Sequence, residues 1–224
     1  MVSFSSSKRS LVDSIKNLRT DYTKGKLNIE EMSKSPSIQL SAWIAEAESN
    51  GVGDSNAFCL STLNKEGFPT GRIVLARGVS DDGIVFYTNK SSSKGVELLK
   101  MEKAGATFFW SEMQRQVRVV GVVSHLSDEE SDDYFASRPR ASQIGAWVSQ
   151  QSEQMESRQV LDSRLEEFTK KFEGSESVPR PPHWGGYLLS LEEVEFWQGR
   201  ASRLHDRVKY SKKNGSWETA LLQP

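Results

Sequence analysis

Between residues 57 and 126 the chain alternates short β-rich runs with glycine-bearing turns, and this pattern constrains the fold more than any other part of the sequence. The first runs are AFCLSTL, GRIVLARGV and IVFYTN, separated by NKEGFPT and by the turn Asp81-Asp82-Gly83. GATFFWSE and QRQVRVVGVVSHL follow a short helix predicted in SSSKGVELLKMEK, where serines can cap the first turn. Runs of this length joined by tight turns are typical of antiparallel hairpins. The sequence therefore predicts a mainly β fold with α additions (α+β), built on a closed or nearly closed antiparallel barrel.

Helical periodicity appears before this strand-rich region. We expect residues 1–8 to be disordered and residues 9–19 to form a short helix, because Leu11, Ile15 and Leu18 have helical spacing. Pro36 then opens an amphipathic helix, and we assign its Trp43 to the core.

The second half of the chain mixes helical and strand patterns. Ser127 to Glu130 is a capping-box pattern for a helix that should end before Pro139. SQIGAWVSQQS is small and polar around its tryptophan, and residues 156–173 carry the longest helical signal, whose apolar stripe we assign to packing. GSESVPRPPHWGG reads as a loop. Two final strands are predicted, in YLLSLEEVEFWQG and in RVKYSKKNGSWETALL.

Composition excludes several classes of protein. The formal net charge of −1 over 224 residues provides no global basic field for nucleic acid. No apolar run approaches the roughly 18–20 residues that cross a bilayer, so we expect no membrane span. The single cysteine, Cys59, excludes an internal disulfide framework, and we expect it to be buried in a strand. These features favour a cytoplasmic location, and the serine-rich, basic N-terminus leaves organellar targeting open.

Catalytic constellations made of protein groups alone are absent. The three histidines are scattered and form no HExxH pair, so we expect no protein-ligated metal. The sequence contains no GxSxG nucleophile elbow, no P-loop and no GxGxxG at the start of a helix. The hard chemistry of an enzyme built this way would come from a bound cofactor.

The segment EFWQGRASRLHDR, residues 195–207, combines a flat apolar pair with dense cationic groups. It contains Phe196 and Trp197, three arginines and His205. A flat apolar surface beside guanidinium donors suits a planar, anionic, aromatic ligand. Within it we expect Phe196 to pack inward and Arg200 to remain in solvent.

Several segments together resemble the pyridoxine (pyridoxamine) 5′-phosphate oxidase family. They are RIVLAR (72–77), FYTN…SKG (86–95), RQVRVVG (115–121), YFASRPRASQIGAWVSQQS (134–152), HWGGY (183–187) and EFWQGRASRLHDR (195–207). The resemblance implies a split β-barrel that binds FMN and works as a homodimer with FMN at the subunit interface. It also implies a single FMN-binding domain over residues 19–224, after a flexible or short helical segment at 1–18.

The resemblance also implies the site residues. FMN contacts would come from Arg72, Ile73, Val74, Leu75, Arg77, Tyr87, Thr88, Ser93, Lys94, Gln116, Gln151, Ser152, Trp197 and Arg207. The substrate would be bound by Arg19, Tyr22, Arg77, Tyr134, Arg138, Ser142, Arg203, Leu204 and His205, with residues 19–22 as a lid. Arg203 and His205 would orient the substrate ring as the catalytic residues. Arg138, with Tyr134 and Ser142, has the composition of a phosphate clamp at a helix end.

The implied activity is FMN-dependent oxidation of pyridoxamine 5′-phosphate and pyridoxine 5′-phosphate to pyridoxal 5′-phosphate. O2 would be the electron acceptor, giving H2O2, and the amine substrate would release ammonia.

Three departures from the family pattern keep two alternatives open. Arg77 stands in place of the usual lysine, Ser93 in place of the arginine that many members carry, and the chain ends in ALLQP. The alternatives are a related FMN-dependent oxidase of phenazine biosynthesis and a flavin- or pyridoxal-phosphate-binding protein without catalysis. RPRASQIGAW favours the vitamin enzyme, because it carries the phosphate clamp.

Overall fold

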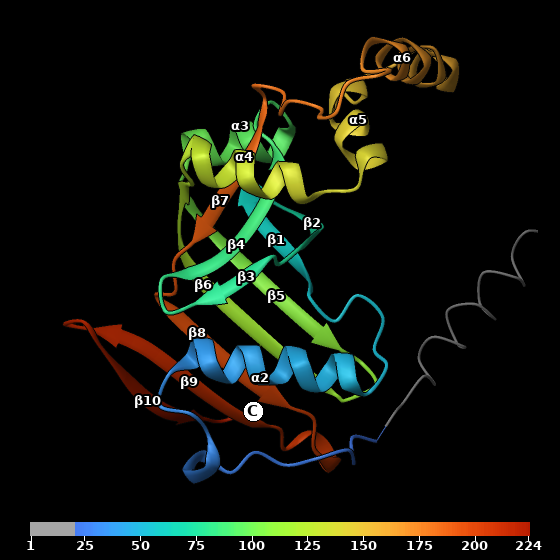
Figure 1. Ribbon diagram of the computed structural model, residues 1–224. Coiled ribbons are helices and arrows are strands. Elements are labelled where there is room, and N and C mark those ends of the chain that lie inside the picture. The colour runs from blue at the N-terminus through green and yellow to red at the C-terminus, as the bar shows by residue number, and fades with distance from the viewer. Residues whose placement is uncertain (1–20) are drawn as a thin grey trace, which may run out of the picture.

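The described strands form one antiparallel sheet. The structure is a computed structural model that describes residues 21–224 (Figure 1). Its ten strands are β1 (Ala57–Leu63), β2 (Pro69–Leu75), β3 (Gly78–Ser80), β4 (Gly83–Asn89), β5 (Lys103–Trp110), β6 (Arg115–His125), β7 (Trp184–Leu189), β8 (Glu193–Gln198), β9 (Asp206–Lys213) and β10 (Ser216–Leu222). The helices are α2 (Pro36–Ser49), α3 (Ser93–Lys100), α4 (Asp128–Ser137), α5 (Arg140–Val148) and α6 (Arg158–Lys171), with 3-10 turns η1 (Ile29–Glu31) and η2 (Ala201–Arg203). The expected helix at 9–19 lies outside the described residues.

The sheet branches at β6, the longest strand. The first half of β6 pairs with β8 and its second half pairs with β7, which continues to β4 and β3. The other path runs from β10 through β9, β8, β6, β5 and β1 to β2. Strands β2 and β4 contact each other without strand pairing in the described chain, so the curled sheet stays split rather than closed. The expectation of a mainly β, antiparallel split barrel with peripheral helices is confirmed.

Helix α2 covers the inner face of the curled sheet and closes the main core. Pro36 occupies its first turn, and the Ser35 side chain accepts from the backbone N–H of Ile38, as an N-cap does. Trp43 is buried as expected and packs edge-on against Phe196, with ring centroids 5.1 Å apart. The expected inward orientation of Phe196 is confirmed too.

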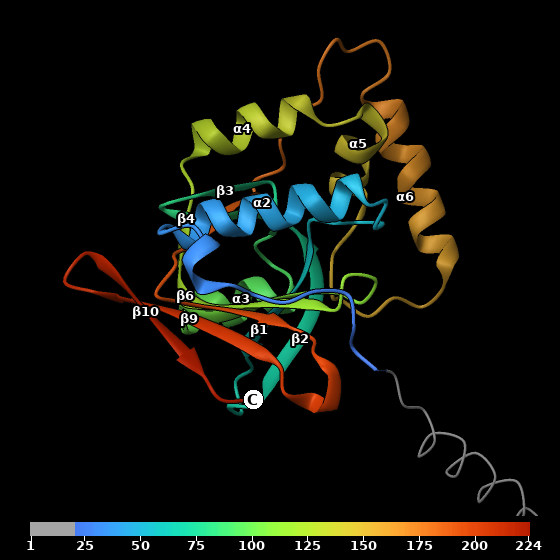
Figure 2. The ribbon, with the colours of Figure 1, turned by 90° about the horizontal axis from the view of Figure 1, so that it is seen from below.

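Helices α5 and α6 stand at the end of the molecule away from the β9–β10 hairpin (Figures 1 and 2). The sequence indicated α6 but not α5, whose small and polar residues hid the helical period. The assignment of the 156–173 stripe to packing is confirmed for Leu161, Phe168 and Phe172, which pack in a hydrophobic cluster with residues of α4 and α5, but not for Val160 and Leu165. Phe172 is buried, but Leu165 is 47% exposed, because α6 packs chiefly on α5 and not on the sheet.

Two expectations about strands also need correction. Each of the two predicted C-terminal strands is a pair of strands: Ser190–Glu192 separates β7 from β8, and the Asn214-Gly215 turn separates β9 from β10. Cys59 lies in β1 as expected but is only half-buried, because its side chain points to the outer face of the sheet.

No helix within residues 21–224 is long and apolar enough to cross a membrane. The same residues contain no group of three or more His, Cys, Asp or Glu side chains arranged to hold a metal ion.

Candidate functional site

A cleft of about 490 Å³ opens between β2, β4 and α4. Most of the residues predicted to bind flavin or substrate phosphate line it, although they are spread over 80 positions of the sequence. Its walls are Arg72, Ile73, Val74, Leu75, Arg77, Tyr87, Thr88, Lys94, Tyr134, Arg138, Gln151, Ser152 and Trp184. We refer to this site as the cleft.

At one side of the cleft a buried ammonium lies beside a fixed guanidinium. Lys94 is 8% exposed, and its Nζ donates to the side-chain oxygens of Gln151 (2.9 Å), Thr88 (3.3 Å) and Ser92 (3.3 Å), which are all neutral. Burial, and then the charge of Arg72, lowers the pKa of Lys94. A buried cation that has only neutral partners is stabilised by an anion.

Arg72 itself is fixed by residues that the sequence did not reveal. Its Nη2 donates to Glu97 Oε2 (2.9 Å) and to Thr70 Oγ1 (2.9 Å), and its Nη1 donates to the hydroxyl of Thr62. The pKa of Glu97 is lowered: hydrogen bonds from Thr62, Thr70 and Arg72 outweigh burial, which alone would raise it. The sequence did offer one signal for the contact between Glu97 and Arg72. Glu97 lies one helical turn after Ser93, which places its carboxylate on the same face of α3 as the predicted flavin-binding residue.

A further cation of the cleft, Arg138, lies against an aromatic wall. The guanidinium of Arg138 lies 4.7 Å from the ring of Trp184, and its Nη1 is buried without a hydrogen-bond partner. Burial is the largest cause that lowers the pKa of Arg138, and Arg77 adds to it. Tyr87 stacks on Tyr134 with ring centroids 3.9 Å apart. Unpartnered donors beside stacked rings can bind the anionic group of an aromatic ligand.

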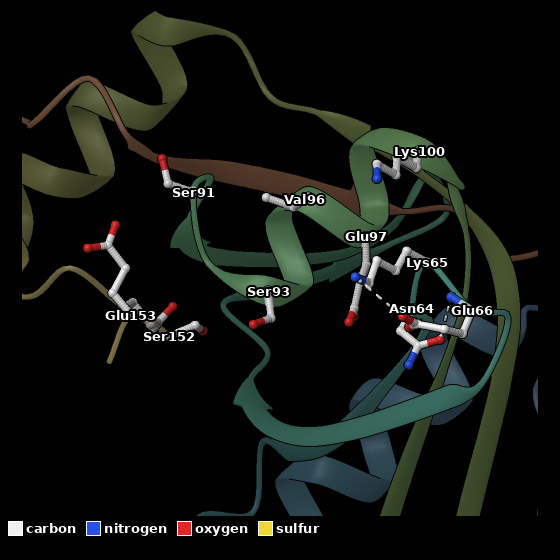
Figure 3. A pocket seen from close by; sticks show the side chains of 11 residues that line it. Asn64, Lys65, Glu66, Ser91, Ser93, Val96, Glu97, Lys100, Ser152 and Glu153 are labelled. Carbon is white, nitrogen blue, oxygen red and sulfur yellow. Dashed lines mark hydrogen bonds and ion pairs between the residues drawn. The ribbon is translucent and has the colours of Figure 1, made fainter. Parts of the chain in front are cut away.

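The loop after α5 supplies Gln151 and Ser152 to the cleft, and Ser152 has φ 76. Ser93, the first residue of α3, lies just outside. It lines a neighbouring pocket of about 370 Å³ that shares Gln151 and Ser152 with the cleft. Figure 3 shows Ser93 on the first turn of α3, between Ser152 and Glu97.

The remaining predicted residues gather elsewhere, on the outer face of the sheet. Gln116, Trp197 and Arg207 form one cross-strand row over β6, β8 and β9. Arg207 is held by a bidentate pair with Glu195, both distances being 2.9 Å, and this hydrogen-bonded pairing raises the pKa of Arg207. We call Tyr22, Gln116, Trp197, His205 and Arg207 the outer cluster; none of these residues lines the cleft.

The turn that carries His205 has an unusual backbone. Ser202 and Arg203 are both in the left-handed region, with φ 57 and 63, and Leu204 is exposed. His205 Nδ1 accepts from the backbone N–H of Arg200 (3.1 Å), which leaves Nε2 as the ring's N–H donor. Burial, and then Arg203, lowers the pKa of His205. Consecutive left-handed residues other than glycine cost conformational energy and are found most often at functional sites.

Some expectations are not met or fall outside the described chain. Arg200 is not free in solvent: its Nη1 is 2.7 Å from Asp206 Oδ2, because the turn folds it back on the first residue of β9. Ser142 lies in the first turn of α5 and does not line the cleft. Arg19 lies outside the described residues. The cleft also contains Trp184, which no prediction assigned to it, although HWGGY contributed to the resemblance.

Solved structures share this architecture. PhzG from Burkholderia lata, crystallised with tetrahydrophenazine-1-carboxylic acid, matches with a TM-score of 0.82 and 28% identity, covering 89% of this chain and 100% of that one. A pyridoxamine 5′-phosphate oxidase-related, FMN-binding protein from Nostoc punctiforme matches with a TM-score of 0.68 at 16% identity, covering 86% and 100%. The fold is that of these split-barrel proteins.

Sequence comparison identifies the family. The model for "Pyridoxamine 5′-phosphate oxidase" matches residues 44–172, and that for "Pyridoxine 5′-phosphate oxidase C-terminal dimerisation region" matches residues 184–224. A pyridoxine/pyridoxamine 5′-phosphate oxidase from Nostoc punctiforme is 46% identical over 94% of this chain and 98% of its own length. One from Synechocystis is 45% identical over the same shares. The chain belongs to the pyridoxine/pyridoxamine 5′-phosphate oxidase family, as its segments predicted.

Proposed function

We propose that this chain is an FMN-dependent oxidase that converts pyridoxamine 5′-phosphate and pyridoxine 5′-phosphate to pyridoxal 5′-phosphate. Its relatives at 45–46% identity carry that name. The observation that carries the proposal is the pair Lys94 and Arg138. Both are cations that line one cleft, and neither has a carboxylate partner within residues 21–224. Two such cations in one cleft fit two ligands that each carry a phosphate.

The chain's own groups fit FMN on the Lys94 side. Lys94 and Arg72 would neutralise the flavin phosphate beside the first turn of α3, where the free N–H groups and the helix dipole also favour an anion. Glu97 keeps the Arg72 guanidinium in place, so little conformational freedom is lost when the anion binds. The exposed strand residue Ile73 and its neighbours in β2 offer the apolar surface that a flavin ring needs.

The substrate phosphate fits the Arg138 side. Arg138 and Arg77 would bind it, and the stacked rings of Tyr87, Tyr134 and Trp184 hold the Arg138 guanidinium in one orientation. Arg203 and the neutral imidazole of His205 would orient the pyridine ring from a partner subunit. When bound, FMN supplies the redox chemistry: it takes two electrons from the C4′ carbon and returns them to O2, which gives H2O2. The amine substrate releases ammonia after hydrolysis.

The positions of the two halves of the site support a site that is shared between two subunits. The cleft opens at β2, and Trp197 and Arg207 of the outer cluster lie on β8 and β9, with β1, β5 and β6 between them. Four strand spacings separate β2 from β8, about 19 Å along the sheet. In register, Ile73, Cys59, Thr107 and Arg118 share one row of the outer face with Glu195. The same face therefore carries the mouth of the cleft and the outer cluster.

Two-fold packing of that face would complete both sites at once. In a two-fold (isologous) interface every contact occurs twice: if a residue of one subunit contacts a patch of its partner, the same residue of the partner contacts the same patch of the first subunit. The partner subunit's Trp197 and Arg207 would then cover the flavin in the cleft, and the partner's His205 would reach the substrate. Exposed apolar residues on this face support the packing: Ile73 is 67% exposed and Phe109 57%. The family region that matches residues 184–224 is described as a dimerisation region, which supports a homodimer.

Turnover in air tests the function. The purified protein, loaded with FMN, should convert pyridoxamine 5′-phosphate to pyridoxal 5′-phosphate with stoichiometric H2O2, and Arg203→Ala should reduce kcat/KM more than about tenfold while flavin absorbance is retained. A flavin-loaded protein that makes no product would contradict the oxidase, and a protein that takes up no FMN would contradict the cofactor.

Complementation between inactive variants tests the shared site. Arg138→Ala and Trp197→Ala should each be nearly inactive, whereas co-expressed chains form hybrid dimers with one intact site. Because half of the dimers are hybrids and each has one of two sites intact, about one quarter of wild-type activity should return. No recovery in verified hybrid dimers would place each complete site within one subunit.

One observation favours a second candidate, an FMN-dependent oxidase of the phenazine type. PhzG from Burkholderia lata has the fold in common at 28% identity, and this chain has Ser93 and the ending ALLQP. A phenazine carboxylate has no phosphate to pair with Arg138. Turnover of a reduced phenazine carboxylate that survives Arg138→Met, without turnover of pyridoxamine phosphate, would establish this candidate. The single domain over 19–224 and the cytoplasmic location stay predictions.

A further inference from the structure

Residues 21–28, which we call the strap, cross the turn that carries His205. Figures 1 and 2 show the strap in blue beside the red turn between β8 and β9. Tyr22 packs edge-on against His205 and Trp197, with ring centroids 5.4 Å and 5.6 Å apart. Gly199 allows the approach, because a Cβ at that position would lie 2.8 Å from the Tyr22 ring.

Gln114 holds this segment through its side chain. Gln114 Oε1 accepts from the backbone N–H groups of Thr23 (2.8 Å) and Lys24 (3.0 Å), and its Nε2 lies 3.4 Å from the carbonyl oxygen of Asp21. One amide therefore binds three residues on both sides of Tyr22. Farther along, Leu27 N–H donates to Asp206 (2.9 Å).

The backbone of Gln114 holds the segment against which the strap packs, at Gln198 and Gly199. Its carbonyl oxygen accepts from the backbone N–H of Gly199 (2.8 Å) and from Gln198 Nε2 (3.1 Å). Gln114 is 6% exposed and has φ 54, in the left-handed region. A buried residue with this backbone, joined to two segments distant in sequence, fixes their relative register.

We propose that Gln114 is a positioning residue, whose side-chain amide holds the strap so that Tyr22 packs on His205 and fixes the wall against which the substrate binds. This role rests on the proposed function for its effect on the substrate, but the anchoring itself does not. Gln114 does not line the cleft, and strand pairing holds Trp197 in β8 without the strap, so the loss of Gln114 should leave FMN binding intact. The expected consequence is weaker substrate binding with little change in kcat.

Two substitutions separate anchoring from packing. Gln114→Met keeps the length of the side chain and removes every hydrogen bond to the strap. Gln114→Glu keeps an acceptor for the N–H groups of Thr23 and Lys24 and loses only the donor to Asp21. Gln159→Met on exposed α6 is the matched control, because it makes the same chemical change far from the strap.

The first measurement needs no activity. Trypsin cleavage after Lys24 and Lys26, followed by mass spectrometry in the FMN-loaded protein, should be at least about tenfold faster in Gln114→Met, because cleavage requires the strap to detach. Gln114→Glu and Gln159→Met should be cleaved at the wild-type rate. Equal cleavage of Gln114→Met and wild type would overturn the anchoring.

The second measurement is steady-state kinetics with pyridoxamine 5′-phosphate. Gln114→Met should raise KM about tenfold with kcat within twofold and FMN affinity unchanged, and Gln114→Glu should restore KM to near the wild-type value. Faster cleavage with an unchanged KM would overturn the positioning role. If the wild type does not turn over this substrate, the proposed function fails, and the cleavage result still decides the anchoring.

Discussion

The cleft and the outer cluster use cations in opposite ways. In the cleft, Lys94 is buried and Arg138 is half-buried with a buried Nη1, and neither has a carboxylate partner in the described chain. In the outer cluster, Arg207 is paired with Glu195, and its neighbour Arg200 is paired with Asp206. The cleft thus keeps positive charge for a ligand, whereas the neighbourhood of Trp197 neutralises its charge internally.

This difference indicates what each region contributes. Buried cations with neutral partners are costly in the empty protein and become favourable when an anion binds, so the cleft is where phosphate binding energy arises. Pre-paired arginines cost little and keep a surface rigid, which suits a wall that must fit against another subunit and a planar ring. Variants of the cleft should therefore change binding strongly, and variants of the paired residues should change stability weakly.

The largest effect is expected for Arg138→Met. Loss of the charge-assisted bonds to the substrate phosphate should reduce kcat/KM for pyridoxamine 5′-phosphate roughly 100-fold, which corresponds to about 3 kcal/mol. FMN should remain bound. The control is Arg140→Met, because the Arg140 guanidinium is exposed and donates to the carbonyl oxygen of Phe172 outside the cleft. Equal losses in both variants would show that the effect is not specific to the cleft.

For Lys94→Met we expect FMN affinity to fall about 10- to 100-fold, because the flavin phosphate loses its buried ammonium. The apoprotein should not lose stability, since the substitution removes a charge whose burial already lowers the pKa of Lys94. Fluorescence titration with FMN and thermal unfolding of the apoprotein measure the two effects. Lys100→Met, on the exposed last turn of α3, controls for helix charge. A destabilised apoprotein would mean that Lys94 has a structural role.

A smaller, pH-dependent effect is expected from His205. Its pKa lies below the ordinary value of 6.5, so the imidazole is neutral at pH 7 and becomes protonated only as the pH falls below that value. If the neutral ring orients the substrate, kcat/KM should fall up to about tenfold for each pH unit below the His205 pKa. Protonation is also disfavoured by folding, so the same acidification should slightly destabilise the fold. His205→Asn should remove this acidic limb from the pH profile, and its persistence would assign the limb to another group.

The sequence could predict what depends on local pattern. Hairpin spacing and turn residues predicted the strands from residue 57 to 126, and the capping box predicted α4, because these depend on neighbours in the chain. The pattern missed α5 and assigned the whole α6 stripe to packing, although Val160 and Leu165 are exposed, because whether a face is covered is decided by tertiary packing.

The site shows the same division. The resemblance to the family predicted most of the residues that line the cleft, and the fold of the sheet brings these residues together. The resemblance missed Glu97 and Gln114, since one acts by fixing Arg72 and the other by joining two distant segments. The sequence also predicted that Arg200 remains in solvent, although the strained turn at Ser202 and Arg203 folds its side chain onto Asp206. Contacts between segments far apart in the chain leave no local signature for a single sequence to reveal.

The smallest effect is expected for Arg200→Ala. This variant compares a paired arginine, Arg200, with Arg203 in the same turn. Arg200 is 39% exposed in its pair with Asp206, and pairs of this exposure contribute only about 0.5–1 kcal/mol to the free energy of unfolding. Asp206 keeps its bond from Leu27, so the strap should stay in place. Urea unfolding should show that small loss, while kcat/KM stays within about twofold, unlike the loss of more than about tenfold expected for Arg203→Ala three residues away. If Arg200→Ala reduces kcat/KM as much as Arg203→Ala does, the shape of the turn, and not the guanidinium of Arg203, would be what the substrate requires.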